Sequence, residues 1–91
     1  MKFDLLSEFI DYIKLQKATV ILSYDIMCYN GSQFWDLINI YIVSDIDTIH
    51  NIIDIILKSD NMNLEKYKID GSFKMVDITF YMKDALKRKN K

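Results

Sequence analysis

The feature that most constrains this chain is a turn followed by alternating apolar residues, a pattern that occurs twice, forty positions apart. The first copy, NGSQFWDLINIYIVSD, spans residues 30–45, and the second, DGSFKMVDITFYMKD, spans residues 70–84. Asn-Gly and Asp-Gly tolerate the positive φ of tight hairpin turns, and apolar alternation is typical of strands. The repeat therefore predicts two hairpins. The matched pairs are Gly31 with Gly71, Ser32 with Ser72, Ile38 with Ile78 and Tyr41 with Tyr81.

An amphipathic helix is expected before each hairpin. In residues 1–17 the apolar side chains recur at the spacing of one helical stripe, and residues 46–58 repeat that spacing. Ser44, with Asp47 three positions on, has the outline of a capping box for the second helix. The stripes consist of Leu6, Phe9, Ile10 and Ile13, and of Ile46, Ile49, Ile53, Ile56 and Leu57.

Four strands follow from the alternation of residues. The first hairpin joins 19–28 to 34–43, and the second joins a short strand around Tyr67 and Ile69 to 73–82. The polar residues 59–65 read as a turn. Asp36 is exceptional, because strict alternation points it at the helices. Either a local bulge turns the Asp36 side chain outward, or water reaches that edge of the sheet.

The order predicts an α+β fold. Two tandem αββ units, 1–43 and 44–82, form a four-stranded antiparallel sheet with two helices on one face, followed by a basic tail, 83–91. A short C-terminal helix from residue 83 is a further option. Two alternatives stay open: the repeat reflects only the residue preferences of any hairpin, or the second hairpin extends the sheet of a dimer.

Size and composition favour one folded domain over residues 1–91. Hydrophobic residues make up 51% of the chain, so the signature of disorder is absent. The apolar runs are shorter than the roughly 20 residues of a bilayer span, and the lone Cys28 agrees with a reducing compartment. We expect a cytoplasmic protein without a membrane segment.

Charge is unevenly distributed. Residues 83–91 contain five basic residues and one acidic residue, whereas residues 1–82 contain seven basic and twelve acidic residues. Such a tail serves as a solvated end, as the last turns of a helix, or as a contact for phosphate or an acidic partner. The candidate tail contacts are Lys83, Lys87, Arg88 and Lys89.

The sheet face opposite the helices is the candidate binding surface. If Ile38 and Ile78 point at the helices, the other face carries large apolar side chains of the kinds enriched at protein interfaces. A partner or a second copy is the expected occupant; cover by a C-terminal helix and incidental exposure are the alternatives. The candidate contact residues are Trp35, Leu37, Tyr41, Phe73, Met75 and Tyr81.

Candidate chemistry is weak. His50, the only histidine, has no nucleophile or further ligand at a recognisable spacing, and Cys28 has no neighbouring base that would lower its pKa. The carboxylates suit helix caps and turns. We predict no catalytic residue, no cofactor and no metal.

The sequence thus favours a non-enzymatic protein-interaction module. No Pro, two Gly and abundant Ile, Asn, Lys, Asp and Tyr are typical of an AT-rich genome. A short chain of this kind fits a phage, virus or mobile-element inhibitor of a host complex, of the anti-CRISPR or anti-defence type. The alternative is a small homodimeric regulator, or a nucleic-acid-binding protein that uses the tail. Nucleic acid is the weaker option, because the exposed face supplies few cations.

Overall fold

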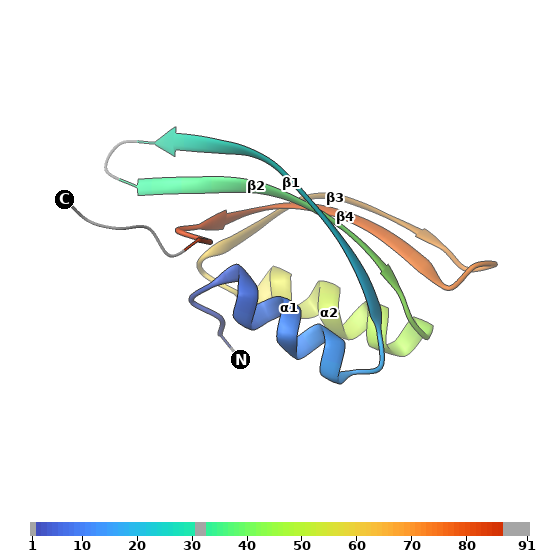
Figure 1. The fold of residues 1–91 in the computed structure, drawn as a ribbon. Helices are drawn as coiled ribbons and strands as arrows, with labels where there is room; N and C mark the ends of the chain where they lie inside the picture. Colours follow the sequence, from blue (N-terminus) through green and yellow to red (C-terminus); the bar gives the residue numbers. More distant parts are fainter. Residues whose placement is uncertain (1, 31–32, 87–91) are drawn as a thin grey trace.

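The structure, a computed structural model, describes residues 2–30 and 33–86, and the side chains of these residues outside 24–33. Two helices and four strands follow each other in the order helix, strand, strand, helix, strand, strand (Figure 1). They are α1 (Leu6–Leu15), β1 (Thr19–Asn30), β2 (Gln33–Val43), α2 (Ile46–Lys58), β3 (Met62–Asp70) and β4 (Met75–Lys83).

The four strands form one antiparallel sheet in the order β1-β2-β4-β3. Each hairpin therefore contributes one central strand, and the hairpins join where β2 pairs with β4, with Ile40 opposite Ile78. Both helices lie on the same face of this sheet (Figure 1). The predicted α+β class, four-stranded antiparallel sheet and two-helix layer are confirmed.

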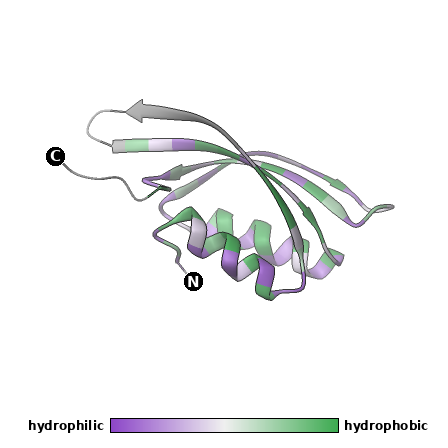
Figure 2. Cartoon of the chain, in the orientation of Figure 1, coloured by the Kyte–Doolittle hydropathy of each residue, from purple (hydrophilic) through white to green (hydrophobic). Residues whose placement is uncertain are grey.

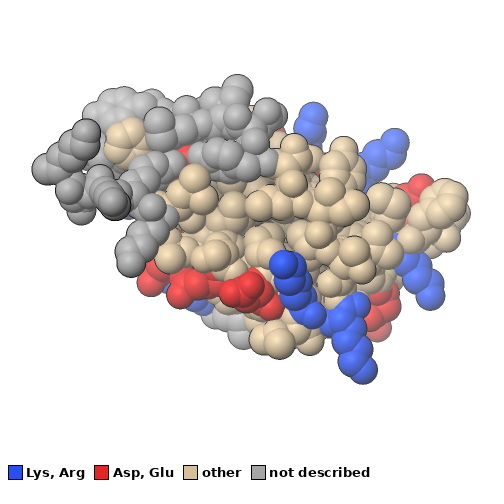
Figure 3. All heavy atoms as spheres, viewed as in Figure 1, with Lys and Arg blue, Asp and Glu red and all other residues tan. Residues whose placement is uncertain are grey.

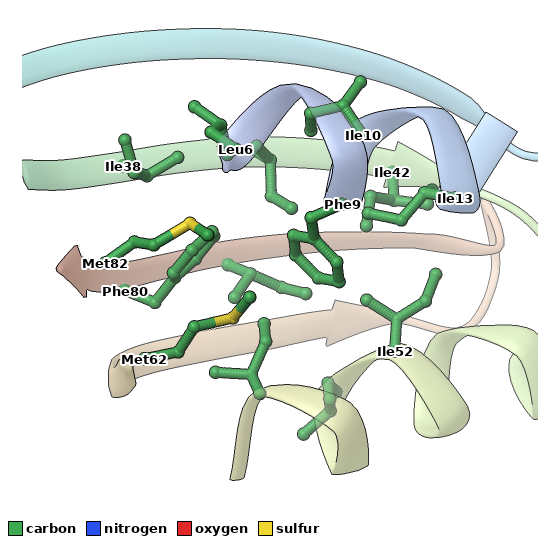
Figure 4. Packing of buried hydrophobic residues seen from close by; sticks show 14 of the residues in the cluster. Leu6, Phe9, Ile10, Ile13, Ile38, Ile42, Ile52, Met62, Phe80 and Met82 are labelled. Carbon is green, nitrogen blue, oxygen red and sulfur yellow. The ribbon is translucent and has the colours of Figure 1, made fainter. Parts of the chain in front are cut away.

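The hydrophobic core lies between the helices and the two central strands. Alternate residues of β2 and β4 are buried, and hydrophobic and hydrophilic residues alternate along these strands (Figure 2). The predicted stripe of α1 is buried, whereas in α2 Leu57, predicted as part of the stripe, is 62% exposed, and the buried residues are Ile49, Ile52, Ile53 and Ile56. Phe9 of α1 points into the middle of the cluster and meets the ring of Phe80 edge-on, with 5.9 Å between centroids (Figure 4). The sheet contributes Ile38, Ile40, Ile42, Val76, Ile78, Phe80 and Met82.

The second hairpin differs from the prediction at both of its ends. β3 begins at Met62, inside the stretch that reads as a turn, and a register shift between Leu64 and Lys66 interrupts its pairing with β4. This bulge hides the alternation of the first residues from a reading of the sequence.

The turn of that hairpin is also longer than expected. Residues 71–74 form it, so β4 starts at Met75 and Phe73 lies in the turn rather than in the strand. Asp70 Oδ1 accepts hydrogen bonds from the N–H groups of Ser72 (3.0 Å) and Phe73 (3.4 Å), and the left-handed φ falls on Lys74 at 52°. The side chain of Asp70 thereby satisfies two backbone N–H groups of the four-residue turn.

Asp45, not Ser44, caps α2. The Asp45 carboxylate accepts hydrogen bonds from the backbone N–H of Thr48 (2.8 Å) and from its hydroxyl (3.0 Å). Ser44 is buried, and its N–H donates to the carbonyl of Lys74 (2.9 Å). The capping-box prediction was wrong by one residue: the cap is Asp45, and Ser44 is held by its backbone hydrogen bond to Lys74.

Asp36 is fully buried on the helix side, as strict alternation requires. Its Oδ2 accepts a hydrogen bond from the N–H of Ala85 (3.1 Å), which satisfies the buried polar atom without a bulge or a wet edge. The contact belongs to a segment that returns across the end of the sheet after β4: Asp84 N–H donates to Phe34 O (2.7 Å), and Leu6 N–H donates to Ala85 O (2.8 Å).

The path of the chain after β4 sets the structure of the first residues of the tail. Lys83 ends β4, Asp84 turns the chain with a φ of 50°, and Ala85 is buried against the helix layer. Residues 83–86 are therefore not helical; the rest of the expected C-terminal helix falls outside the described residues. Among the described helices, none combines the length and the apolar character that crossing a bilayer takes.

Replacing Asp36 with Ala should destabilise the fold by roughly 1–3 kcal/mol, because the buried N–H of Ala85 loses its acceptor. Chemical unfolding measures the change, and hydrogen exchange at the Ala85 amide should accelerate. Asp60→Ala is the control, since Asp60 is exposed and makes only a surface ion pair with Lys2 (3.3 Å). Equal effects of the two substitutions would contradict the assigned role.

The Asp45 cap should make stability depend on acid pH. The Thr48 backbone N–H, and then its hydroxyl, hold the pKa of Asp45 below its ordinary value of 3.8. A lowered pKa in the folded state stabilises the fold above the unfolded-state pKa, and this contribution is lost as pH falls through the folded-state pKa. Asn caps helices equally well and does not titrate in this range.

The measurement is the stability of wild type minus that of Asp45→Asn, followed from about pH 6 to about pH 2. All other carboxylates are common to both proteins, so the difference isolates Asp45. We expect the wild-type advantage to shrink with acid. A difference that stays constant over this range would show that the cap does not titrate as described.

Candidate interaction surface

The open face is the side of the sheet that faces away from the helices. The residues that alternate with the buried positions, from Trp35 to Tyr41 in β2 and from Met75 to Tyr81 in β4, point to this side and are half-buried, because neighbouring strands flank them. We define the open face by Trp35, Leu37, Asn39 and Tyr41 of β2 and by Met75, Asp77, Thr79 and Tyr81 of β4.

Five of the six predicted contact residues lie on this face: Trp35, Leu37, Tyr41, Met75 and Tyr81. Phe73 does not share their register, since it lies in the turn before β4 and is 70% exposed. Lys83, predicted as part of the tail, is the last residue of β4 and lies opposite Trp35. Lys87, Arg88 and Lys89 fall outside the described residues.

A polar cluster occupies the centre of the open face. The side-chain nitrogen of Asn39 donates to Asp77 Oδ1 (2.8 Å), to Thr79 Oγ1 (2.9 Å) and, more weakly, to the carbonyl of Ile78 (3.3 Å). These bonds link β2 to β4 at the junction of the two hairpins. The cluster fixes polar groups in the middle of an otherwise apolar surface.

Apolar side chains lie on both sides of that cluster. Toward one end of the sheet, Leu37 lies directly opposite Tyr81, with Trp35 two residues along. Toward the other end, Tyr41 has Ile21 of β1 as its cross-strand neighbour, and Val43 lies opposite Met75. Side chains directly opposite in antiparallel strands touch, so each group forms a continuous patch.

Lysines border the face along β3. Lys66 lies opposite Thr79 and Lys68 lies opposite Asp77, which places both on the open side, and both are exposed. With Asp77 and Tyr67 they line a recess of about 180 Å³. This border was not predicted from the sequence, where the basic residues are most concentrated in the tail. Lys66 and Lys68 alternate with apolar residues in the sequence, but their neighbours in the sheet depend on strand order.

The described part of the chain leaves the open face uncovered. Residues 84–86 turn toward α1, where Ala85 contacts Asp36 and Leu6, both on the helix side of the sheet. Up to residue 86 the tail therefore runs away from the open face. This arrangement speaks against intramolecular cover by the start of the tail.

Catalytic chemistry has little basis in the described residues. His50 is exposed on α2, and the side chain of Cys28 is outside the description. Asp45 and Asp70 are engaged in a cap and a turn, and Asp54 forms an ion pair with Lys58 within α2 (2.9 Å). Within residues 2–30 and 33–86, no three His, Cys, Asp or Glu side chains that the structure places gather to hold a metal ion.

Comparisons with models of protein families, with curated proteins and with solved structures gave no match to this chain. Functional inference therefore rests on the geometry of the open face.

Proposed function

We propose that this protein is a non-enzymatic interaction module that binds a partner protein with its open face. The observation that carries the proposal is the gathering of Trp35, Leu37, Tyr41, Met75 and Tyr81 on one uncovered side of the sheet. Trp and Tyr dominate the binding energy of protein interfaces, because large rigid rings bury area at little entropic cost.

The layout of the face suits a protein surface. Its strands hold the anchors rigidly, the Asn39–Asp77 bond supplies polar groups at the centre, and Lys66 and Lys68 form a charged border. Interfaces commonly combine buried apolar anchors with a polar rim. The border favours a partner with acidic residues around an apolar depression.

The specific form that we propose is an inhibitor of a host complex, encoded by a phage, virus or mobile element and acting by occupying a surface. Composition supports this form: no Pro, two Gly and abundant Ile, Asn, Lys, Asp and Tyr. An inhibitor of this kind needs a rigid scaffold and contact residues rather than catalytic groups. The small α+β sheet with one bare face meets both needs.

Replacing Trp35 and Tyr41 together with Ala should weaken partner binding by about thirtyfold or more, the effect of losing roughly 2 kcal/mol of contact energy. Affinity capture from a host-cell extract, followed by titration with the captured partner, measures the loss. Leu15→Ala combined with Leu57→Ala is the matched control, because both side chains are exposed and belong to the helices, away from the open face.

Circular dichroism should show both double variants folded. Equal capture by the wild type and by the open-face variant would remove the proposal. Equal losses in the two double variants would show that the effect is not specific to the open face.

A single-stranded nucleic acid is the second candidate ligand of this face. Aromatic rings on a sheet with lysines beside them are the arrangement that stacks bases and holds phosphates. Lys66, Lys68 and Lys83 on the open side favour it, whereas Asp77 in the centre opposes it. We expect protein binding to dominate.

Fluorescence anisotropy with single-stranded DNA and RNA, at about 50 mM and about 200 mM salt, separates the two ligands. Our proposal predicts no retention at either salt concentration. Binding that weakens steeply with salt and disappears in Lys66→Gln/Lys68→Gln would instead assign the face to nucleic acid.

A further inference from the structure

The two edges of the sheet differ in how well they are protected. Unpaired edge strands invite pairing with other chains, and proteins block them with charges and bulges. The β3 edge has both protections: a bulge near Glu65, and four charged residues among its nine. β1 also has a bulge, between Tyr24 and Ile26, and a charged residue, Asp25, but its first five residues, Thr19–Ser23, precede both, pair regularly with β2 and carry no charge.

Apolar side chains project from this stretch on both faces. Ile21, on the open side opposite Tyr41, is 59% exposed, and Leu22, opposite Ile40 on the helix side, is 46% exposed. In Figure 3 the described surface over the first half of β1 is uncharged. In the described part of the chain, no strand pairs with the outer side of β1.

The residues Thr19–Ser23 are complementary to themselves in the antiparallel direction. If two copies pair about a two-fold axis at Ile21, Ile21 meets Ile21 of the second copy, Val20 meets Leu22, and Thr19 meets Ser23. Apolar residues then meet apolar residues and hydroxyls meet hydroxyls, so the stretch is self-complementary, as a two-fold interface between identical subunits requires. The same operation on β3, centred on Tyr67, would place Lys66 against Lys68 and repel.

An apolar groove next to this edge enlarges the contact. It lies between α1 and β1 and has a volume of about 300 Å³. Leu6, Ile10, Leu22 and Leu86 form most of its lining, and Ser7, Asp11 and Lys14 of α1 add polar groups. Since β1 is the last strand of the sheet, the groove lies at the same edge. A two-fold pairing brings the two grooves together on the helix side and covers Leu22.

We propose that β1 pairs with β1 of a second copy of this chain, antiparallel about a two-fold axis at Ile21. The two four-stranded sheets become one sheet of eight strands. The axis is normal to the sheet, so all helices remain on one side and the two open faces form one surface. This inference goes beyond the proposed function and does not depend on it.

Sedimentation velocity of the full chain, over a range of concentrations, tests the proposal. The wild type should reach the mass of a dimer as concentration rises. Ile21→Lys should raise the dissociation constant at least about tenfold, because it places like charges opposite each other at the axis. The control is Leu57→Lys, a substitution at an equally exposed side chain on α2, and it should leave the constant unchanged.

A second experiment tests the register of the proposed pairing, in which Ile21 lies opposite Ile21 of the second copy. Ile21→Glu should also be monomeric alone, but mixing it with Ile21→Lys should restore a dimer, since the axis then pairs unlike charges. Should the lysine and glutamate variants not fold, Ile21→Cys in a Cys28→Ser background replaces them. Mild oxidation should then link two copies, whereas Leu57→Cys in the same background should stay unlinked.

Three results would overturn the proposal. The first is a wild type that stays monomeric at all concentrations. The second is a dimer that persists unchanged in Ile21→Lys. The third is a mixture of oppositely charged variants that does not associate. Partner capture is measured separately, so a monomeric protein that still binds its partner would refute the dimer alone.

Discussion

The pairing of β2 with β4 is the constraint on which the rest of the structure depends. It joins the two hairpins through their apolar strands and sets Ile40 against Ile78 in the middle of the sheet. Because side chains alternate along a strand, this one register sends seven apolar residues to the helices and their neighbours to the opposite side. The Asn39 bonds to Asp77 and Thr79 cross the same junction. A slip of one residue would exchange the core for the open face, so the core and the candidate binding surface share one cause.

Periodicity predicted the elements that are regular. The stripes of α1 and α2 and the alternation of β2 and β4 are long and uninterrupted, so the helices and the central strands followed from the sequence. The ends of the second hairpin could not be predicted, because local irregularities interrupt the alternation there. The bulge after Leu64 concealed the start of β3, and residues 71–74 form a longer turn than the tight one that Asp-Gly indicated. Alternation predicted that Asp36 points at the helices, but not what satisfies its carboxylate there, because Ala85, whose N–H donates to it, lies 49 positions away.

The candidate binding surface also has a part that the sequence predicts and a part that it does not. Trp35, Leu37, Tyr41, Met75 and Tyr81 could be assigned to one face from strand parity, which needs only the local sequence. The lysine border could not, because Lys66 and Lys68 become neighbours of the aromatic residues only when β3 lies beside β4. The direction of the tail likewise depends on contacts with α1. Parity is a local property, whereas strand order and long-range hydrogen bonds are properties of the whole fold.

The strand order also explains why one face and one edge of the sheet expose apolar side chains. Within the described residues, a sheet with both helices on one side leaves one face and two edges uncovered. Charged residues and a bulge protect the β3 edge. The first half of β1 is as apolar as the central strands, but Ile21 and Leu22 in it are exposed because no strand lies beside them in the described part of the chain. Ile21 lies where the bare face meets that free edge, opposite Tyr41. A second copy at the edge would bury Ile21 and would bring two sets of Trp35 and Tyr41 onto one continuous surface. Self-association would then present a partner with two copies of the binding face rather than compete for it.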